Sequence, residues 1–338
     1  MSTHRAAFLD GVAQSLRAGA IPTPTPSPGE ILIRNKALAI NPIDWKQQTY
    51  GFYIDAFPVI LGTDSSGVVA AVGEGVTKFK VGQRVIGHGI TLATKNNANG
   101  AFQEYTLCPE GAVAPIPDSL TFEEASVLPL AVSTAAAGLF EKNHLGLEYP
   151  GAPGDRSGKT VLVWGGSSSV GSLAIQLAKA AGYRVLATSS EKNFDFVASL
   201  GATPFDYRRG DVFKGIGEEL RKGEFVGIYD AIAEGDTGKI CSEIAKELGG
   251  GVIASALDPP PELPSGVTAQ MIFAPTVFLM EPAVAKAIWQ DFLPQALADG
   301  RIKPTPRVDV VGAGLEAIQG AMEKHKQGVS ASKIVVSL

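Results

Sequence analysis

The chain has 338 residues, and its 45% hydrophobic and 19% charged residues, with 39 glycines and 22 prolines, describe a turn-rich globular protein long enough for two domains. A formal net charge of −5 and the lack of a long Lys/Arg run exclude nucleic acid as an expected partner. No apolar run reaches the roughly 18 residues of a membrane span, and the first residues show no secretory pattern, so we expect a cytoplasmic protein with no membrane partner.

The cysteines and histidines are too scattered in the sequence to predict a disulfide scaffold or a zinc site. The two cysteines, Cys108 and Cys241, are far apart in sequence, which excludes a disulfide scaffold. The four histidines show no zinc-ligand spacing either. We therefore expect no metal site.

The first third of the chain predicts short β-strands separated by turns. Residues 30–40, EILIRNKALAI, follow a proline-rich turn over residues 22–29. The later runs SSGVVAAVGEGV, KVGQRVIGHG and AFQEYTLCP repeat the pattern of brief β-branched runs punctuated by glycine. This pattern indicates an all-β, barrel-like region, and helices are expected only from about residue 119, with Ser119 or Thr121 as the cap.

The second half of the chain alternates strand and helix patterns. After a polar linker over residues 146–159, we expect strands at residues 160–164, 184–188, 227–230 and 251–255. Such alternation is typical of a parallel sheet covered by helices on both faces. A helix near residues 315–325 and a strand over SKIVVSL close the chain.

The stretch VLVWGGSSSVG predicts a phosphate-binding turn between a strand and a helix. Gly166 and Gly171 are the first and third glycines of a G-x-G-x-x-G motif, and Ser168 stands at the second position. A helix start with free N–H groups suits an anionic phosphate, and Ser167, Ser168 and Ser169 add hydroxyl donors, with Val170 beside them. The alternative is a serine-rich turn that binds nothing.

The end of the next strand predicts which nucleotide binds. NAD sites normally carry an acid there for the ribose 2′-OH, but this chain has Ser189 and Ser190, followed by Lys192 and Asn193. Neutral hydroxyls and a nearby cation favour NADPH, although Glu191 is discordant and Lys192 could equally be a solvated surface lysine. Tyr207 could close over the same phosphate or be an ordinary half-buried tyrosine.

With these motifs, the chain resembles the zinc-independent medium-chain dehydrogenases/reductases. The resemblance rests on AINPIDWK, LGTDSSGVVAAVGEGV, VLVWGGSSSVG and LGATPFDY, in that order, and is closest to the fungal trans-acting enoyl reductase and quinone oxidoreductase-like branch. It implies an α/β fold with two domains: a GroES-like β-barrel catalytic domain over residues 1–125, completed by about 305–338, and a Rossmann NADPH-binding domain with a doubly wound parallel sheet over 126–304.

Zinc-dependent members of that superfamily carry a Cys where this chain has Pro42 or Ile43, and a His-Glu pair where it has Thr63-Asp64. Proline, isoleucine and threonine offer no thiolate or imidazole to a metal. Without a Lewis acid, the chemistry within reach is hydride delivery to an activated C=C bond, since the substrate's own carbonyl spreads the developing charge.

The resemblance also implies site residues. Asn41, Asp44, Trp45 and Lys46 are expected at the nicotinamide, although Asp44 could merely cap a helix. Tyr53, with Lys46, is the expected catalytic residue for the substrate carbonyl, although a loop aromatic is more often core. Cofactor contacts are further expected from Thr134, Ala256, Leu257, Val329 and Ser330, and substrate contacts from Leu130, Val132, Ser133, Phe273 and Phe278.

We therefore expect an NADPH-dependent, metal-free ene-reductase of fungal secondary metabolism. Its partner would be a small lipophilic enone, enoyl thioester or quinone, with a carrier-bound substrate as an option. A quinone oxidoreductase and a catalytically silent NADPH-binding protein are the alternatives. The apolar segment over residues 269–280 is either a pocket wall or a dimer edge; Pro275 weakens a regular strand there, so a monomer is favoured over a homodimer.

Overall fold

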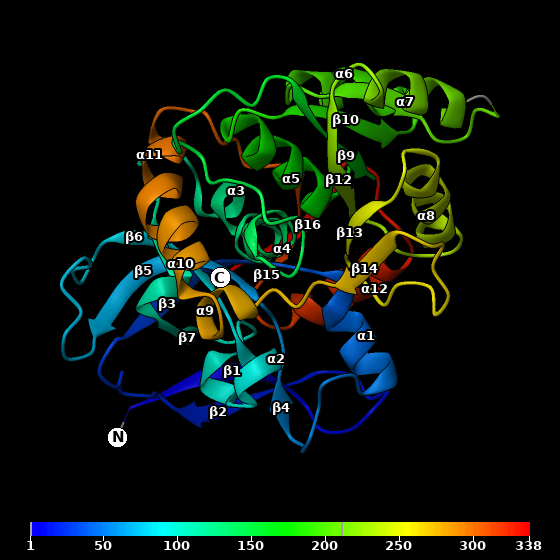
Figure 1. The fold of residues 1–338 in the computed structure, drawn as a ribbon. Coiled ribbons are helices and arrows are strands. Elements are labelled where there is room, and N and C mark those ends of the chain that lie inside the picture. The colour runs from blue at the N-terminus through cyan, green and yellow to red at the C-terminus, as the bar shows by residue number, and fades with distance from the viewer. Residues whose placement is uncertain (1, 211) are drawn as a thin grey trace. The chain divides into compact units, whose positions relative to one another are not determined.

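The computed structural model describes residues 2–210 and 212–338. They form two compact units (Figure 1): one comprises the chain up to Leu130 together with Trp289–Leu338, and the other comprises Ala131–Ile288. Within the described ranges, no helix is both long and apolar enough to cross a membrane.

The first unit is mainly antiparallel β-structure. A three-stranded sheet has the order β2-β1-β4, and a seven-stranded sheet has the order β15-β16-β3-β5-β6-β8, with β7 also paired to β3. The strands are β1 (Thr3–Leu9), β2 (Arg17–Pro22), β3 (Glu30–Ala39), β4 (Val59–Ile60), β5 (Asp64–Val72), β6 (Arg84–His88), β7 (Tyr105–Pro109), β8 (Val113–Pro115), β15 (Arg307–Ala313) and β16 (Ser332–Ser337). This arrangement confirms the strand-rich prediction for the first third of the chain.

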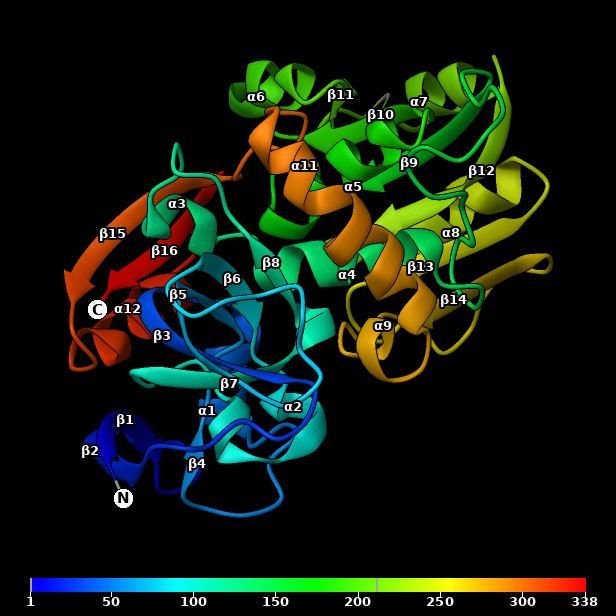
Figure 2. The ribbon, with the colours of Figure 1, turned by 90° about the vertical axis from the view of Figure 1, so that its left-hand side faces the viewer.

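Helices in this unit correct one expectation. Two helices precede residue 119, α1 (Pro42–Tyr50) and α2 (Thr91–Thr94). The motif NPIDWK conceals α1, because Asn-Pro reads as a turn although proline is well suited to the first turn of a helix. The unit also contains α3 (Phe122–Ser126), α11 (Leu293–Ala298) and α12 (Ala317–Lys326). Of the two predicted caps, Ser119 and Thr121, it is Thr121 that caps α3. Figure 2 shows β15 and β16 side by side, with α12 linking them.

The second unit is a six-stranded parallel sheet with helices on both faces. Its strand order is β11-β10-β9-β12-β13-β14. The strands are β9 (Lys159–Trp164), β10 (Arg184–Ser189), β11 (Thr203–Asp206), β12 (Glu224–Asp230), β13 (Gly251–Ser255) and β14 (Val267–Met271). The four predicted strands are confirmed, whereas β11 and β14 were not predicted.

Alternating side chains on these strands explain the two covered faces. Leu162, Leu186 and Ile228 pack in one apolar cluster with residues of α7 (Val212–Leu220) and α8 (Thr237–Glu247). Helices α4 (Pro129–Phe140) and α5 (Ser169–Ala180), with α6 (Phe194–Ser199), α9 (Thr276–Leu279) and α10 (Pro282–Ala285), complete the helices of this part of the chain. The segment after β14 turns into α9 at Pro275, so the apolar run is not one continuous strand.

Candidate cofactor and active site

The turn between β9 and α5 has the geometry that the glycine motif predicts. Ser168 is the N-cap of α5, and its Oγ accepts a hydrogen bond from the Gly171 N–H at 3.0 Å. A Cβ on Gly171 would lie 2.2 Å from the Gly165 carbonyl oxygen, so the start of the helix packs directly against the turn. Leu173, Ala174, Leu177 and Ala178 of α5 are fully buried, which fixes the helix on the sheet.

A cluster of hydroxyls joins this turn to the end of β10. The Asn193 Nδ2 donates to Ser167 Oγ at 3.3 Å and to Ser190 Oγ at 3.2 Å. Thr188 of β10 fixes the start of the turn against this strand, because its Oγ1 accepts a hydrogen bond from the Gly165 N–H at 2.9 Å. The structure thus brings together Ser167, Ser190 and Asn193, three of the predicted cofactor residues.

Charges around this cluster come from the next two loops. Lys192 is exposed beside Ser190. Asp206, which pairs in register with Ser189, accepts from the Arg208 guanidinium at 2.9 Å. That hydrogen bond lowers the pKa of Asp206. Arg208 thereby neutralises Asp206, which lies opposite the last residue of β10, and its side chain remains 54% exposed.

Sequence reasoning missed Arg208. The signal was present as the two arginines of FDYRR, directly after a strand, where Tyr207 alone was singled out. Tyr207 is 48% exposed, so its ring is accessible, and its contact with a phosphate stays a prediction.

The loop after β13 contains Ala256 and Leu257, two of the predicted cofactor residues. Ala256 follows β13, and its N–H donates to the Asp230 carbonyl at 2.9 Å. The Asp230 carboxylate accepts from the N–H groups of Ile232 and Ala233 at 3.1 and 2.9 Å. Ala256 and Leu257 are partly buried, and their contact with the cofactor stays a prediction.

Helix α4 is an alanine-rich helix that is largely buried. Val132 and Ser133 are fully buried, and the Thr134 carbonyl accepts from the Tyr229 hydroxyl at 2.7 Å. Contact of these residues with substrate or cofactor stays a prediction. The same holds for Phe273 and Phe278, which are partly buried, and for Val329 and Ser330, which are exposed in the loop before β16.

In the first unit, Asn41 and Asp44 begin helix α1. Asn41 is the N-cap, and its N–H donates to Asp44 Oδ2 at 2.7 Å. Asp44 is fully buried, and its Oδ1 has no hydrogen-bond partner. The structure therefore shows the capping role for Asp44 that sequence reasoning left open.

Burial makes Asp44 an unusual carboxyl. Desolvation raises its pKa from 3.8 to about 7, against the Asn41 hydrogen bond, which lowers it. A carboxyl with a raised pKa holds a proton in the folded state that the unfolded state has already released, so folding stability falls as pH rises from about 4 to about 7.

The Asp44→Asn variant is expected to lack this pH dependence while keeping an oxygen that accepts from Asn41. Relative to it, the wild type should lose on the order of 2–4 kcal/mol of unfolding free energy between about pH 4 and pH 8. Urea unfolding across that range measures the difference. Asp118→Asn, at a carboxylate whose side chain is 99% exposed, is the control, and a pH-independent gap between wild type and Asp44→Asn would contradict the assignment.

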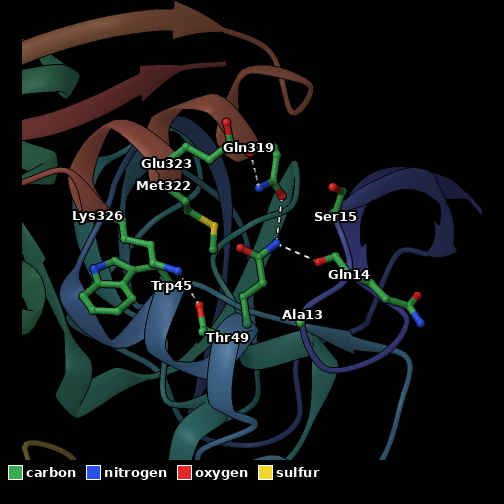
Figure 3. Close-up of a pocket in the computed structure, with 10 residues that line it drawn as sticks. Ala13, Gln14, Ser15, Trp45, Thr49, Gln319, Met322, Glu323 and Lys326 are labelled. Atoms are coloured by element: carbon green, nitrogen blue, oxygen red, sulfur yellow. Dashed lines mark hydrogen bonds between the residues drawn. The ribbon is translucent and has the colours of Figure 1, made fainter.

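The outer side of α1 lines a cavity of about 270 Å³ within the first unit. Gln48 is one of the lining residues, and its Nε2 donates to the Gln14 carbonyl and to Gln319 Oε1, both at 2.8 Å. Figure 3 shows Gln14 and Gln319 on opposite elements of the lining. The Lys326 ammonium lies 5.6 Å from the centre of the Trp45 ring, as does that of Lys46. The lining residues are Ala13, Gln14, Ser15, Trp45, Gln48, Thr49, Gln319, Met322, Glu323 and Lys326.

Tyr53 lies in the loop that follows α1. Its φ is +57°, a left-handed conformation that a non-glycine residue adopts only when its surroundings hold it. The Lys95 ammonium donates to the Tyr53 carbonyl at 2.7 Å, and the Tyr53 side chain stays 42% exposed. The ring is accessible, and its catalytic role stays a prediction.

Asp64 and Lys333, neither of which the sequence singled out as a site residue, lie beside Asn41. The Lys333 ammonium and Asp64 Oδ2 are 3.0 Å apart, and both side chains are buried. Asp64 stands where a zinc-dependent relative has a glutamate, and here it is held by an ammonium. Within residues 2–210 and 212–338, no three His, Cys, Asp or Glu side chains are grouped as metal ligands.

The chain is similar in sequence to a known domain family and to two fungal proteins. Residues 27–118 match the alcohol dehydrogenase GroES-like domain. The chain is 42% identical to the dehydrogenase azaJ of Aspergillus niger, with 100% of both covered. It is 43% identical to the trans-enoyl reductase himH of Aspergillus japonicus, over 96% of this chain and 94% of that one.

Among solved structures, an alcohol dehydrogenase superfamily protein from Novosphingobium aromaticivorans matches with a TM-score of 0.81 and 26% identity, over 99% of each chain. That match confirms the predicted fold class, a GroES-like β-domain joined to a Rossmann-like parallel sheet. The fold, the sequence similarity and the glycine-rich turn all indicate the same superfamily. The chain belongs to the medium-chain dehydrogenase/reductase superfamily of oxidoreductases, together with fungal dehydrogenases and trans-enoyl reductases.

Proposed function

We propose that the protein is an NADPH-dependent, zinc-independent ene-reductase that reduces the C=C bond of an α,β-unsaturated carbonyl in fungal secondary metabolism. The observation that carries this proposal is the 43% identity to a trans-enoyl reductase across nearly the whole chain. The substrate class is accordingly an enoyl thioester or a lipophilic enone, free or carried on a partner protein.

The preference for NADPH rests on the surroundings of β10. The hydroxyls of Ser167 and Ser190, oriented by Asn193, can donate to a phosphate, and no acid directly ends the strand. The nearest buried carboxylate, Asp206, is already paired with Arg208. A 2′-phosphate would thus meet Lys192 and the exposed Arg208, and the exposed Glu191 remains the discordant negative charge beside them.

The proposed chemistry needs little from the protein beyond position and dipoles. Bound NADPH would supply the hydride for the β-carbon. Tyr53, in the loop after α1, is the proposed hydrogen-bond partner of the substrate carbonyl, where negative charge develops. Lys46, within α1, is the proposed cation that stabilises that charge. The α-carbon of the resulting enolate would take its proton from water or from a side chain.

The test is turnover of NADPH with two substrate classes. Loss of nicotinamide absorbance is followed with a short-chain enoyl thioester and with a benzoquinone, each with and without EDTA. We expect the thioester to exceed the quinone in kcat/KM by about tenfold or more, with no effect of the chelator. Faster reduction of the quinone would identify a quinone oxidoreductase instead. Tight NADPH binding without oxidation by either substrate would identify a silent cofactor-binding protein, and loss of activity in EDTA would contradict zinc independence.

A further inference from the structure

The last strand of the chain places a buried lysine at the start of helix α1. In β16, Val335 pairs with Ala39 of β3, and the Ile40 N–H donates to the Ile334 carbonyl at 2.9 Å. Continuing that antiparallel register sets Lys333 opposite Asn41. Lys333 is only 2% exposed, although lysine is rarely buried unless it is paired.

Lys333 contacts two side chains, those of Asn41 and Asp64, and each of these lies at the start of a helix or bonds to its backbone. Its ammonium donates to Asn41 Oδ1 and forms the ion pair with Asp64. The same Asp64 oxygen accepts from Asn41 Nδ2 at 2.8 Å, so the three side chains close a ring. Asn41 Nδ2 is also 3.1 Å from Thr63 Oγ1.

The second oxygen of Asp64 reaches another helix. Asp64 Oδ1 accepts from the Leu130 N–H at 2.6 Å, in the first turn of α4. A carboxylate at that point satisfies one of the N–H groups that every helix start leaves without a partner inside the helix. One ammonium therefore connects the first turns of two helices, α1 through Asn41 and α4 through Asp64.

The charges around the ammonium make it hard to replace. Asp64 is fully buried, and within the described residues Lys333 is the only cation in ion-pair contact with it. Removing that ammonium would leave an unpaired carboxylate in a low-dielectric interior. The charge of Lys333 also lowers the pKa of Asp44 and of the largely buried His325, after the larger effect of burial on each. The titratable groups that face Lys333 are thus Asp64, Asp44 and His325.

We propose that Lys333 is a positioning residue: through Asp64 and Asn41, it holds the first turns of α1 and α4 in the orientation that cofactor binding and turnover require. The proposal rests on the proposed function only in taking α1 and α4 as carriers of cofactor and substrate contacts. The ring of contacts itself is within the first unit. Lys333 acts through its neighbours and is not proposed to touch substrate.

The test compares Lys333→Met, Lys333→Arg and Asn35→Ala. Asn35 is the matched control, because it is a buried polar residue of the same sheet whose Nδ2 donates to the Gln103 carbonyl at 2.7 Å and to Thr106 Oγ1 at 2.8 Å, away from both helices. Hydrogen exchange is measured on peptides covering residues 40–50 and 127–135, with NADPH affinity and, for the substrate that the enzyme turns over, kcat and KM.

We expect Lys333→Met to speed exchange in both peptides about tenfold or more and to lower kcat about tenfold, with partial rescue in Lys333→Arg and neither change in Asn35→Ala. Unchanged exchange in the two peptides, or equally faster exchange throughout the sheet, would overturn the proposal. If Lys333→Met does not fold, Lys333→Met combined with Asp64→Asn removes both charges; protection of both helix starts in that variant would overturn it as well. The exchange and binding measurements remain informative if no ene-reductase activity is found.

Discussion

Replacing Gly171 with alanine is expected to weaken NADPH binding by about 100-fold or more and to lower the unfolding free energy by about 1–3 kcal/mol. The added Cβ would lie 2.2 Å from the Gly165 carbonyl oxygen and 2.9 Å from Ser168 Oγ. A backbone oxygen cannot rotate away as a side chain can, so the turn and the first turn of α5 must separate. The N–H groups that face a pyrophosphate would separate with them.

Isothermal titration of NADPH and thermal unfolding measure the two effects of Gly171→Ala. Gly320→Ala is the matched control, because that glycine is also helical, in α12, and a Cβ there meets nothing within 4 Å. We expect Gly320→Ala to bind NADPH normally and to be neutral or more stable by about 0.5–1 kcal/mol. Normal NADPH affinity in Gly171→Ala would mean that the phosphate does not bind at this turn.

The second large effect is expected at Lys192. In Lys192→Glu, the dissociation constant for NADPH should rise about 10- to 100-fold while that for NADH changes less than about threefold, since only NADPH carries the 2′-phosphate. The loss should shrink at high salt, because Lys192 is exposed and its field is screened. Fluorescence titration of both cofactors at low and high ionic strength measures the preference.

Lys246→Glu is the control, because it makes the same change in net charge in the last turn of α8, a helix of the same unit. Lys246 is in the last turn of α8, and its side chain is 55% exposed. We expect it to leave the preference between the two cofactors unchanged. Equal weakening of NADPH and NADH by Lys192→Glu would remove our account of cofactor choice, and would direct attention to Arg208 as the residue that faces the ribose.

Some features of the site were predictable because they are local. The turn VLVWGGSSSVG was recognised because strand, glycines and helix follow one another in the chain, and the packing of Gly171 against Gly165 needs no distant residue. Arg208 could have been found in the same way, since it pairs with Asp206 only two positions earlier. Helix α1 was left open, through Asp44 as a possible cap, because its proline and asparagine fit a turn and a helix start equally well.

The sequence by itself indicated the strand-rich first third, the alternation of strands and helices after it and the glycine-rich turn between β9 and α5, because periodic apolar patterns and short glycine spacings are read within one element. The superfamily was inferred from the resemblance of its motifs. Only the tertiary structure decided which charges meet inside the first unit. Lys333 and Asn41 are 292 positions apart and are joined by the register of β16 against β3. Strand pairing over such a distance depends on the packing of the whole sheet, which no local pattern encodes.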